Sequence, residues 1–125
     1  MANTFDPDTL ETLNRTYEID IETSRGDGAP VHRVTIWVVV DGDETYVRSV
    51  RGPTGRWYRE VLANPHGAIH VAGRRIELEA EPATDAETIE RVSDALKRKY
   101  GRWPGPLAGM LREQVLPTTM RVKPA

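Results

Sequence analysis

The residues best suited to chemistry lie in one stretch, Tyr46 to Tyr58, which combines arginines, hydroxyl side chains, glycines and a tryptophan. Its pattern predicts a strand, a glycine-containing loop and the start of a helix. A phosphate at such a junction is bound by free backbone N–H groups and by the positive end of the helix dipole. Gly52 and Gly55 would let the backbone approach an anion closely. The alternative is a polar hairpin loop whose arginines point into water.

Several side chains in this stretch are candidate anion ligands. Hydroxyl donors come from Ser49 and Thr54. Arg48 and Arg56 supply forked guanidinium groups that match phosphate oxygens. Because side chains alternate along a strand, Arg48 and Arg51 should point to the face opposite Ser49. We therefore expect Ser49 and Arg56 to contact the anion in preference to Arg48.

Other candidates lie nearby or further along the chain. Trp57 offers a flat face for a ring. Arg33 interrupts a hydrophobic strand and is expected at a barrel rim or cleft, although an arginine extending from an edge strand gives the same pattern. His66 and His70 lie in a loop and a strand without a matching carboxylate pattern, so no metal site is expected. There is no phosphate-loop motif and no Ser-His-Asp order, and no residue is an evident acid or base.

Length and composition restrict the class of protein. The chain has 125 residues, 38% of them hydrophobic, which predicts a single globular domain over residues 1–125. A formal net charge of −2 argues against a nucleic-acid-binding protein. The absence of cysteine excludes disulfides and thiolate metal sites. The N-terminal residues do not resemble a signal peptide, and the longest apolar run, residues 36–40, is too short to span a membrane. We expect a cytoplasmic protein with no nucleic-acid or membrane partner.

Periodicity and capping signals predict a mixed sequence of helices and strands. Asp6 before Pro7 marks a helix N-terminus, and Thr84 with Glu87 forms a capping box for the longest helix. Six strands in a chain of this length predict a mainly β (α+β) fold, an antiparallel barrel with peripheral helices. The expected helices are 7–14, 56–64, 85–100 and 107–115, and the expected strands are 17–23, 31–40, 45–51, 68–72, 76–81 and 120–122.

Residues Thr23 to Gly73 resemble the deazaflavin-dependent nitroreductase branch of the flavin-reductase-like split β-barrels, a group that includes the pyridoxamine phosphate oxidase type. A basic residue before an Asp-Gly-Asp hairpin, here Arg33, belongs to the same pattern, and Leu116 to Val122 is similar to the closing strand. The Arg-Ser-Val-Arg-Gly and Gly-Arg-Trp-Tyr elements also resemble a small actinobacterial group, domain of unknown function 2255. The main motif occupies Ser49, Gly52, Trp57, Val61, Asn64 and Pro65.

The resemblance implies a six-stranded split β-barrel that forms a homodimer, with flavin mononucleotide (FMN) or a deazaflavin in a groove at the dimer interface. It implies hydride transfer to a small organic acceptor. The alternatives are a non-catalytic dimer that binds or carries a flavin, haem or similar planar anionic ligand, and a dimeric scaffold whose anion loop has lost its ligand. The expected cofactor-binding residues are Arg33, Ser49, Thr54, Gly55, Arg56 and Trp57.

Two positions depart from the family pattern. Glu60 stands where the family has asparagine, three residues after the tryptophan, and its carboxylate would repel a phosphate if it pointed into the site. The turn Arg25 to Gly28 is shorter and more acidic than the basic turn of the deazaflavin branch. Deazaflavin has a polyanionic tail, so an acidic turn should bind deazaflavin more weakly than the basic turn of the family does.

Overall fold

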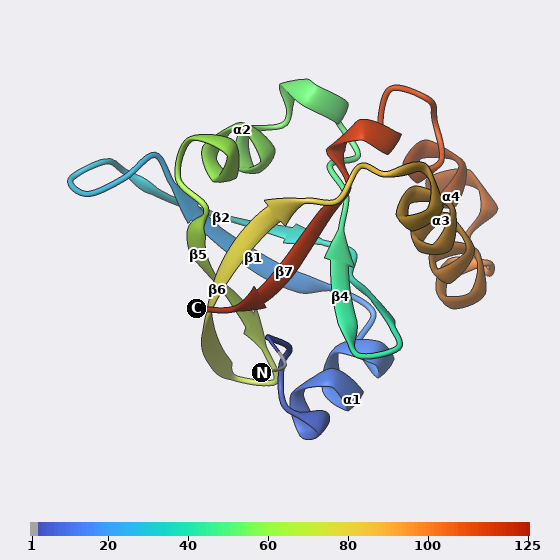
Figure 1. The fold of residues 1–125 in the computed structure, drawn as a ribbon, viewed down its shortest axis with the longest axis horizontal. Coiled ribbons are helices and arrows are strands. Elements are labelled where there is room, and N and C mark those ends of the chain that lie inside the picture. The colour runs from blue at the N-terminus through green and yellow to red at the C-terminus, as the bar shows by residue number, and fades with distance from the viewer. Residues whose placement is uncertain (1–2) are drawn as a thin grey trace.

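Seven antiparallel strands form one curled sheet in the computed structural model, which describes residues 3–125 (Figure 1). The strand order is β2-β1-β5-β6-β7-β4-β3. The helices are α1 (Pro7–Arg15), α2 (Arg56–Ala63), α3 (Ala86–Tyr100) and α4 (Pro104–Met110), with single 3-10 turns at Gly52–Thr54 and Leu116–Thr118. The strands are β1 (Ile19–Ser24), β2 (Val31–Ile36), β3 (Val39–Asp41), β4 (Glu44–Val47), β5 (His66–Val71), β6 (Arg74–Pro82) and β7 (Met120–Pro124).

The expected antiparallel barrel is confirmed, but the expectation of six strands is wrong because the strand at 31–40 is divided in two. Both backbone polar groups of Val38 bond to side chains of α3. Its N–H donates to the Tyr100 hydroxyl at 3.2 Å, and its carbonyl accepts from Lys99 Nζ at 2.7 Å. Because these side chains take the place of a neighbouring strand, the ladder of β2 stops and β3 begins a new one with β4.

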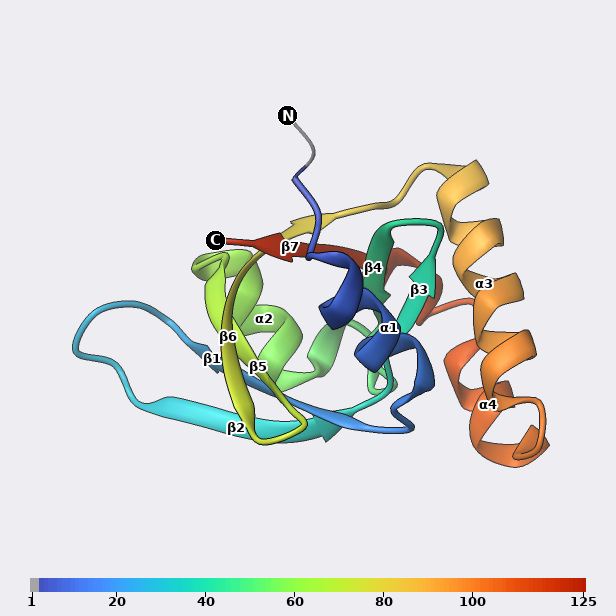
Figure 2. The same ribbon diagram turned by 90° about the horizontal axis from the view of Figure 1, so that it is seen from below.

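The division of this strand also explains why the sheet closes. β2 and β3 are the two edges of the sheet, yet only Trp37 and Val38 separate them in sequence. Three Cα–Cα steps span at most roughly 11 Å, so the edges must lie near each other. The sheet therefore curls into a barrel with one seam, as the view from below shows (Figure 2).

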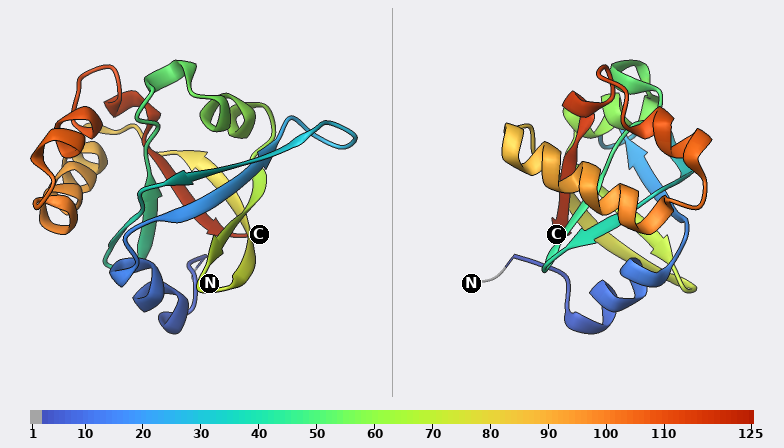
Figure 3. Two further views of the ribbon diagram at one scale, coloured as in Figure 1. Left: turned by 180° about the vertical axis from the view of Figure 1, so that it is seen from behind. Right: turned by 90° about the vertical axis from the view of Figure 1, so that its right-hand side faces the viewer.

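Helices cover the barrel at three places. α1 covers one end, beside β3 (Figure 2). α2 lies at the opposite end, whereas α3 and α4 pack together along the side that carries β3 and β4 (Figure 3). Ile21, Ile69 and Leu78 are fully buried in the barrel core, and a second core lies between the sheet and α3 with α4. Within residues 3–125, none of the helices has the length and apolar character required to cross a membrane.

Capping explains where the helices begin. The Asp6 carboxylate accepts a hydrogen bond from the Thr9 N–H at 2.8 Å, as expected for α1. The expectation that Thr84 caps α3 is wrong, because the Asp85 carboxylate accepts from the N–H and hydroxyl of Thr88 instead. The last helix starts at Pro104 rather than at residue 107. Proline has no N–H to lose in the first helical turn, so it begins α4 instead of breaking the chain.

The outer face of β1 carries an ion-pair network that makes stability depend on pH. The guanidinium of Arg75 and the ring of His70 hydrogen-bond Glu22 and lower its pKa to about 2. Because this pKa lies below its unfolded value, the network stabilises the fold above about pH 5 and loses that effect as the pH falls towards 2. Urea unfolding should show wild type losing on the order of 2 kcal/mol more than Glu22→Gln across this range. If wild type and Glu22→Gln lose the same free energy of unfolding over this pH range, Glu22 is not the source of the pH dependence.

Candidate functional site

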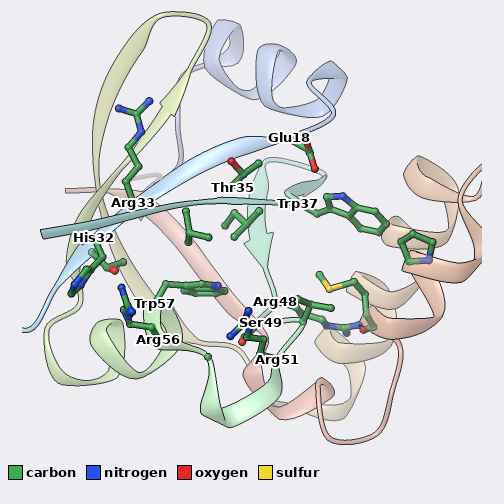
Figure 4. A pocket seen from close by; sticks show the side chains of 17 residues that line it. Glu18, His32, Arg33, Thr35, Trp37, Arg48, Ser49, Arg51, Arg56 and Trp57 are labelled. Atoms are coloured by element: carbon green, nitrogen blue, oxygen red, sulfur yellow. Dashed lines mark hydrogen bonds between the residues drawn. The ribbon is translucent and has the colours of Figure 1, made fainter.

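A cavity of about 520 Å³ opens between β2, α2 and α4, with the loop of residues 48–55 along one side (Figure 4). This volume lies within the range of small-molecule sites, about 300–1,000 Å³. Apolar side chains from three separate segments form much of the wall. They are Val34, Ile36, Trp37, Trp57, Pro106 and Met110.

Ser49 and Gly55 shape the loop beside the cavity. The Ser49 hydroxyl donates to the Gly52 carbonyl at 2.8 Å, and the Ser49 N–H donates to the Thr118 hydroxyl at 3.0 Å. A methyl group at position 55 would overlap Ser49 Oγ, so a larger residue there would displace the Ser49 hydroxyl. Since its proton is already donated, the Ser49 hydroxyl can accept a hydrogen bond from a ligand but has no second proton to give.

The start of α2 presents donors to the same cavity. The N-cap residue, Gly55, makes no side-chain capping bond, so the N–H groups of the first turn receive no side-chain partner from the cap. Arg56 and Trp57 both line the cavity, with the Trp57 ring between the loop and β2 (Figure 4). The predicted order of strand, glycine loop and helix start is confirmed at this point.

Two of the expected site residues have other partners. The Arg33 guanidinium donates to Asp20 at 2.8 Å, and its side chain points away from Trp57 at the rim (Figure 4). The Thr54 hydroxyl donates to the Arg51 carbonyl at 3.0 Å, and Thr54 does not line the cavity. The structure thus brings together Ser49, Gly55, Arg56 and Trp57, with Arg33 at the edge.

Arg48, Ser49 and Arg51 all line this cavity. The expectation that Arg51 points opposite Ser49 is wrong in its own terms, because residues two apart along a strand share a face. β4 ends at Val47, so the alternation of a strand does not extend to these positions.

Arg48 is a buried charge at the cavity wall. It is 2% exposed, and its guanidinium donates to three neutral oxygens, those of Thr119, Met110 and Ile89. Burial lowers the pKa of Arg48 to about 10. Within residues 3–125 no carboxylate pairs with it, so its charge is uncompensated next to the cavity.

Glu60 does not point into the cavity, which removes the expected repulsion. Its carboxylate is 3% exposed and accepts two hydrogen bonds, from the Thr23 hydroxyl at 2.7 Å and from His32 Nδ1 at 2.8 Å. Thr23 and His32 line the cavity, whereas Glu60 lies behind them. A buried carboxylate is tolerated when it is fully hydrogen-bonded, and these two partners meet that need.

The cavity is predominantly positive. Arg33, Arg48, Arg51 and Arg56 line it, against the single carboxylate of Glu18. In the part of the chain that the structure describes, the ion pairs involve neither Arg51 nor Arg56. Guanidinium groups without a carboxylate beside apolar walls favour a ligand that is both flat and anionic.

Comparison with known families identifies the chain. Residues 9–122 match the family described as uncharacterized proteins conserved in bacteria, DUF2255. The chain belongs to this family. A search of curated proteins found no match to the DUF2255 chain.

Solved structures share the fold of the DUF2255 chain at low sequence identity. HutZ, the heme storage protein of Vibrio cholerae, superposes with a TM-score of 0.69 at 15% identity, over 98% of this chain and 91% of that one. A FAD-binding protein from Mesorhizobium loti gives 0.65 at 18% identity, over 98% and 91%. An F420-H2 dependent reductase gives 0.61 at 14% identity, over 88% and 96%. The split-barrel fold is confirmed.

His32 is a cavity residue of the DUF2255 chain that sequence reasoning missed, as it missed the contact of His32 with Glu60. Their contact joins β2 to α2 across 28 positions, a separation with no local signature. The sequence did hold one signal for His32. Neighbouring side chains on a strand point to opposite faces, so if Arg33 points outward, His32 must point inward. The remaining histidines play no such part, because His70 pairs with Glu22 and His66 lies outside this cavity.

Proposed function

We propose that the cavity binds a flavin-type cofactor, FMN or a deazaflavin, and that the protein transfers a hydride from it to a small organic acceptor. The observation that carries the proposal is one cavity in which tryptophan rings and aliphatic walls adjoin guanidinium groups without carboxylate partners. A flavin has the same two parts, an apolar planar ring and an anionic tail. The FAD-binding protein and the F420-H2 dependent reductase with this fold support the same reading.

The protein's own residues would bind, orient and shield this ligand. Trp57 and Trp37 offer flat faces for the ring, while Val34, Ile36 and Met110 exclude water from it. Arg56 and the N–H groups at the start of α2 would hold the phosphate. When bound in its reduced form, the cofactor would supply the hydride and be oxidised in the transfer. The test is a titration of the purified protein with FMN and with deazaflavin, followed by fluorescence quenching. Micromolar binding of either supports the proposal, and the absence of binding by both contradicts it.

Replacing Arg56 with alanine should weaken FMN binding by about 1.5–3 kcal/mol, because one charge-assisted hydrogen bond to the phosphate is lost. Arg59→Ala is the matched control. Arg59 lies on the same helix and is exposed, but it does not line the cavity. Fluorescence titration of both variants measures the effect, and equal dissociation constants would remove Arg56 from the site.

A second function is a non-catalytic carrier of a flavin, haem or similar planar anionic ligand. HutZ, which is described as a heme storage protein, has this fold and supports that alternative. The cavity chemistry serves a carrier equally well, since binding needs the same apolar walls and cations. Haem is therefore included in the titration. Tight binding of a cofactor without turnover of any hydride acceptor would favour the carrier.

We propose that a second copy of the chain closes the open side of the cavity. β2 is an edge strand whose Val31 and Val34 are 63% and 45% exposed, and Val34 lines the cavity. Val50, 50% exposed, also lines it. Sedimentation should give twice the 14.0 kDa mass of one chain, and a monomer at micromolar concentration would contradict the proposal. The cytoplasmic location stays a prediction from the sequence.

A further inference from the structure

The position of His32 leaves one of its ring nitrogens available to the cavity. His32 on β2 lies opposite Thr23 on β1, and both side chains reach the carboxylate of Glu60. A carboxylate only accepts hydrogen bonds, so the hydrogen on Nδ1 must point to Glu60. Nε2 is then the atom left to contact a ligand, and His32 is among the residues that line the cavity.

Arg56 brings a second donor to the same place. It lies four residues before Glu60 on α2, so both side chains are on one face of the helix. Both residues line the cavity, and Figure 4 shows the Arg56 and His32 side chains towards the same end of it. Glu60 is engaged at the other ring nitrogen, so no carboxylate of the described residues bridges these two groups. A guanidinium and a ring nitrogen that share one end of the cavity, with no carboxylate between them, fit an anion.

We infer that His32 and Arg56 bind one anionic group together, a phosphate monoester, and that His32 does so in its protonated form. The inference rests on the proposed function, in which a phosphorylated planar cofactor occupies the cavity. The guanidinium fork takes two phosphate oxygens, and Nε2–H of the imidazolium donates to a third. In the neutral ring, Nε2 carries a lone pair that faces the anion. The protonated ring therefore binds the phosphate more tightly than the neutral ring, and affinity should be higher in mildly acidic solution.

Few other charged groups surround His32. From α2, Glu60 and Arg56 face it. From β1, Thr23 faces it, whereas Glu22 points to the opposite face of the sheet and pairs there with Arg75. Within the described residues of one chain, β2 is an edge strand and no further strand lies on its other side. Guanidinium groups keep their charge near neutral pH, so His32 is the side chain of this anion site whose protonation would change the site's charge.

The test compares FMN with riboflavin, which has the same ring but no phosphate. His32→Asn removes Nε2 and keeps an N–H that can donate to Glu60, so the buried carboxylate stays partnered. His66→Asn is the matched control, because His66 is exposed and outside the cavity. Dissociation constants are measured by fluorescence at about pH 6 and about pH 8, on either side of the usual histidine range. The phosphate of FMN titrates equally with wild type and His32→Asn, so the difference between them reports His32.

The inference predicts that His32→Asn weakens FMN about tenfold at about pH 6, has little effect at about pH 8, and leaves riboflavin unchanged. FMN binding that His32→Asn leaves unaltered at both pH values would overturn it, while the proposed function would stand. In a second measurement, inorganic phosphate is added to wild type and the His32 ring resonances are recorded by NMR. If neither flavin binds but phosphate shifts these resonances, the inference holds and the proposed cofactor fails. No response to phosphate or to FMN overturns the inference.

Discussion

Replacing Tyr100 with alanine is expected to lower the free energy of unfolding by about 3–5 kcal/mol, the usual cost of removing a buried aromatic ring. Tyr100 is fully buried, and its ring stacks on Trp37 with centroids 3.8 Å apart and planes 3° from parallel. Its hydroxyl accepts from the Val38 N–H and donates to the Tyr17 carbonyl at 2.7 Å. Burial raises the pKa of Tyr100 to about 12, so this proton is retained.

Tyr100→Ala should weaken the seam of the barrel, between β2 and β3, as well as its core. Val38 separates β2 from β3, and Tyr100 supplies one of the two side chains that bind its backbone. Tyr100→Phe keeps the ring and should cost about 1–3 kcal/mol, the penalty of unpaired buried polar groups. Leu62→Ala is the control, because Leu62 is 52% exposed and should change stability little. Chemical denaturation measures all three variants, and similar midpoints for Tyr100→Ala and Leu62→Ala would contradict the role of Tyr100.

Gly67→Ala should destabilise the protein by about 3 kcal/mol, because a methyl group there would overlap the backbone carbonyl oxygen of Glu22. Gly67 lies in β5, which pairs with β1 near the middle of the sheet. A flexible side chain could move aside, but a strand backbone cannot do so without losing hydrogen bonds. The expected result is a lower unfolding midpoint together with faster amide exchange in β1 and β5.

Gly109→Ala provides the matched control for this substitution. The added methyl group would meet Val50 Cγ2 at 3.6 Å, an ordinary contact, and alanine favours the helical conformation of α4 by up to about 1 kcal/mol. Gly109→Ala should therefore be neutral or stabilising. If the two glycine variants unfold at the same denaturant concentration, close packing of β5 against β1 is not what requires glycine at position 67.

Much of the fold was predictable because it depends on local patterns. Alternation marked β1 and β6, and Asp6 with Pro7 marked α1. The break at Val38 was not predictable, because Lys99 and Tyr100 cause it from about sixty residues away. The same distinction between local patterns and distant contacts explains which site residues could be predicted. Arg56 and Trp57 belong to a local motif, whereas the contact of His32 with Glu60 and the burial of Arg48 depend on elements that meet only in the folded chain.

The position of β7 has a consequence for how the protein can be made. This strand comes from residues 120–124, yet it lies inside the sheet between β6 and β4. During synthesis, the two strands that flank it have no partner on their inner edges until those residues have left the ribosome. The barrel therefore completes its sheet late, and a nascent chain exposes unpaired strand edges that invite aggregation. Chaperone demand should be highest in that interval, and stalled chains lacking residues 120–124 should bind holdases far more than the full chain does.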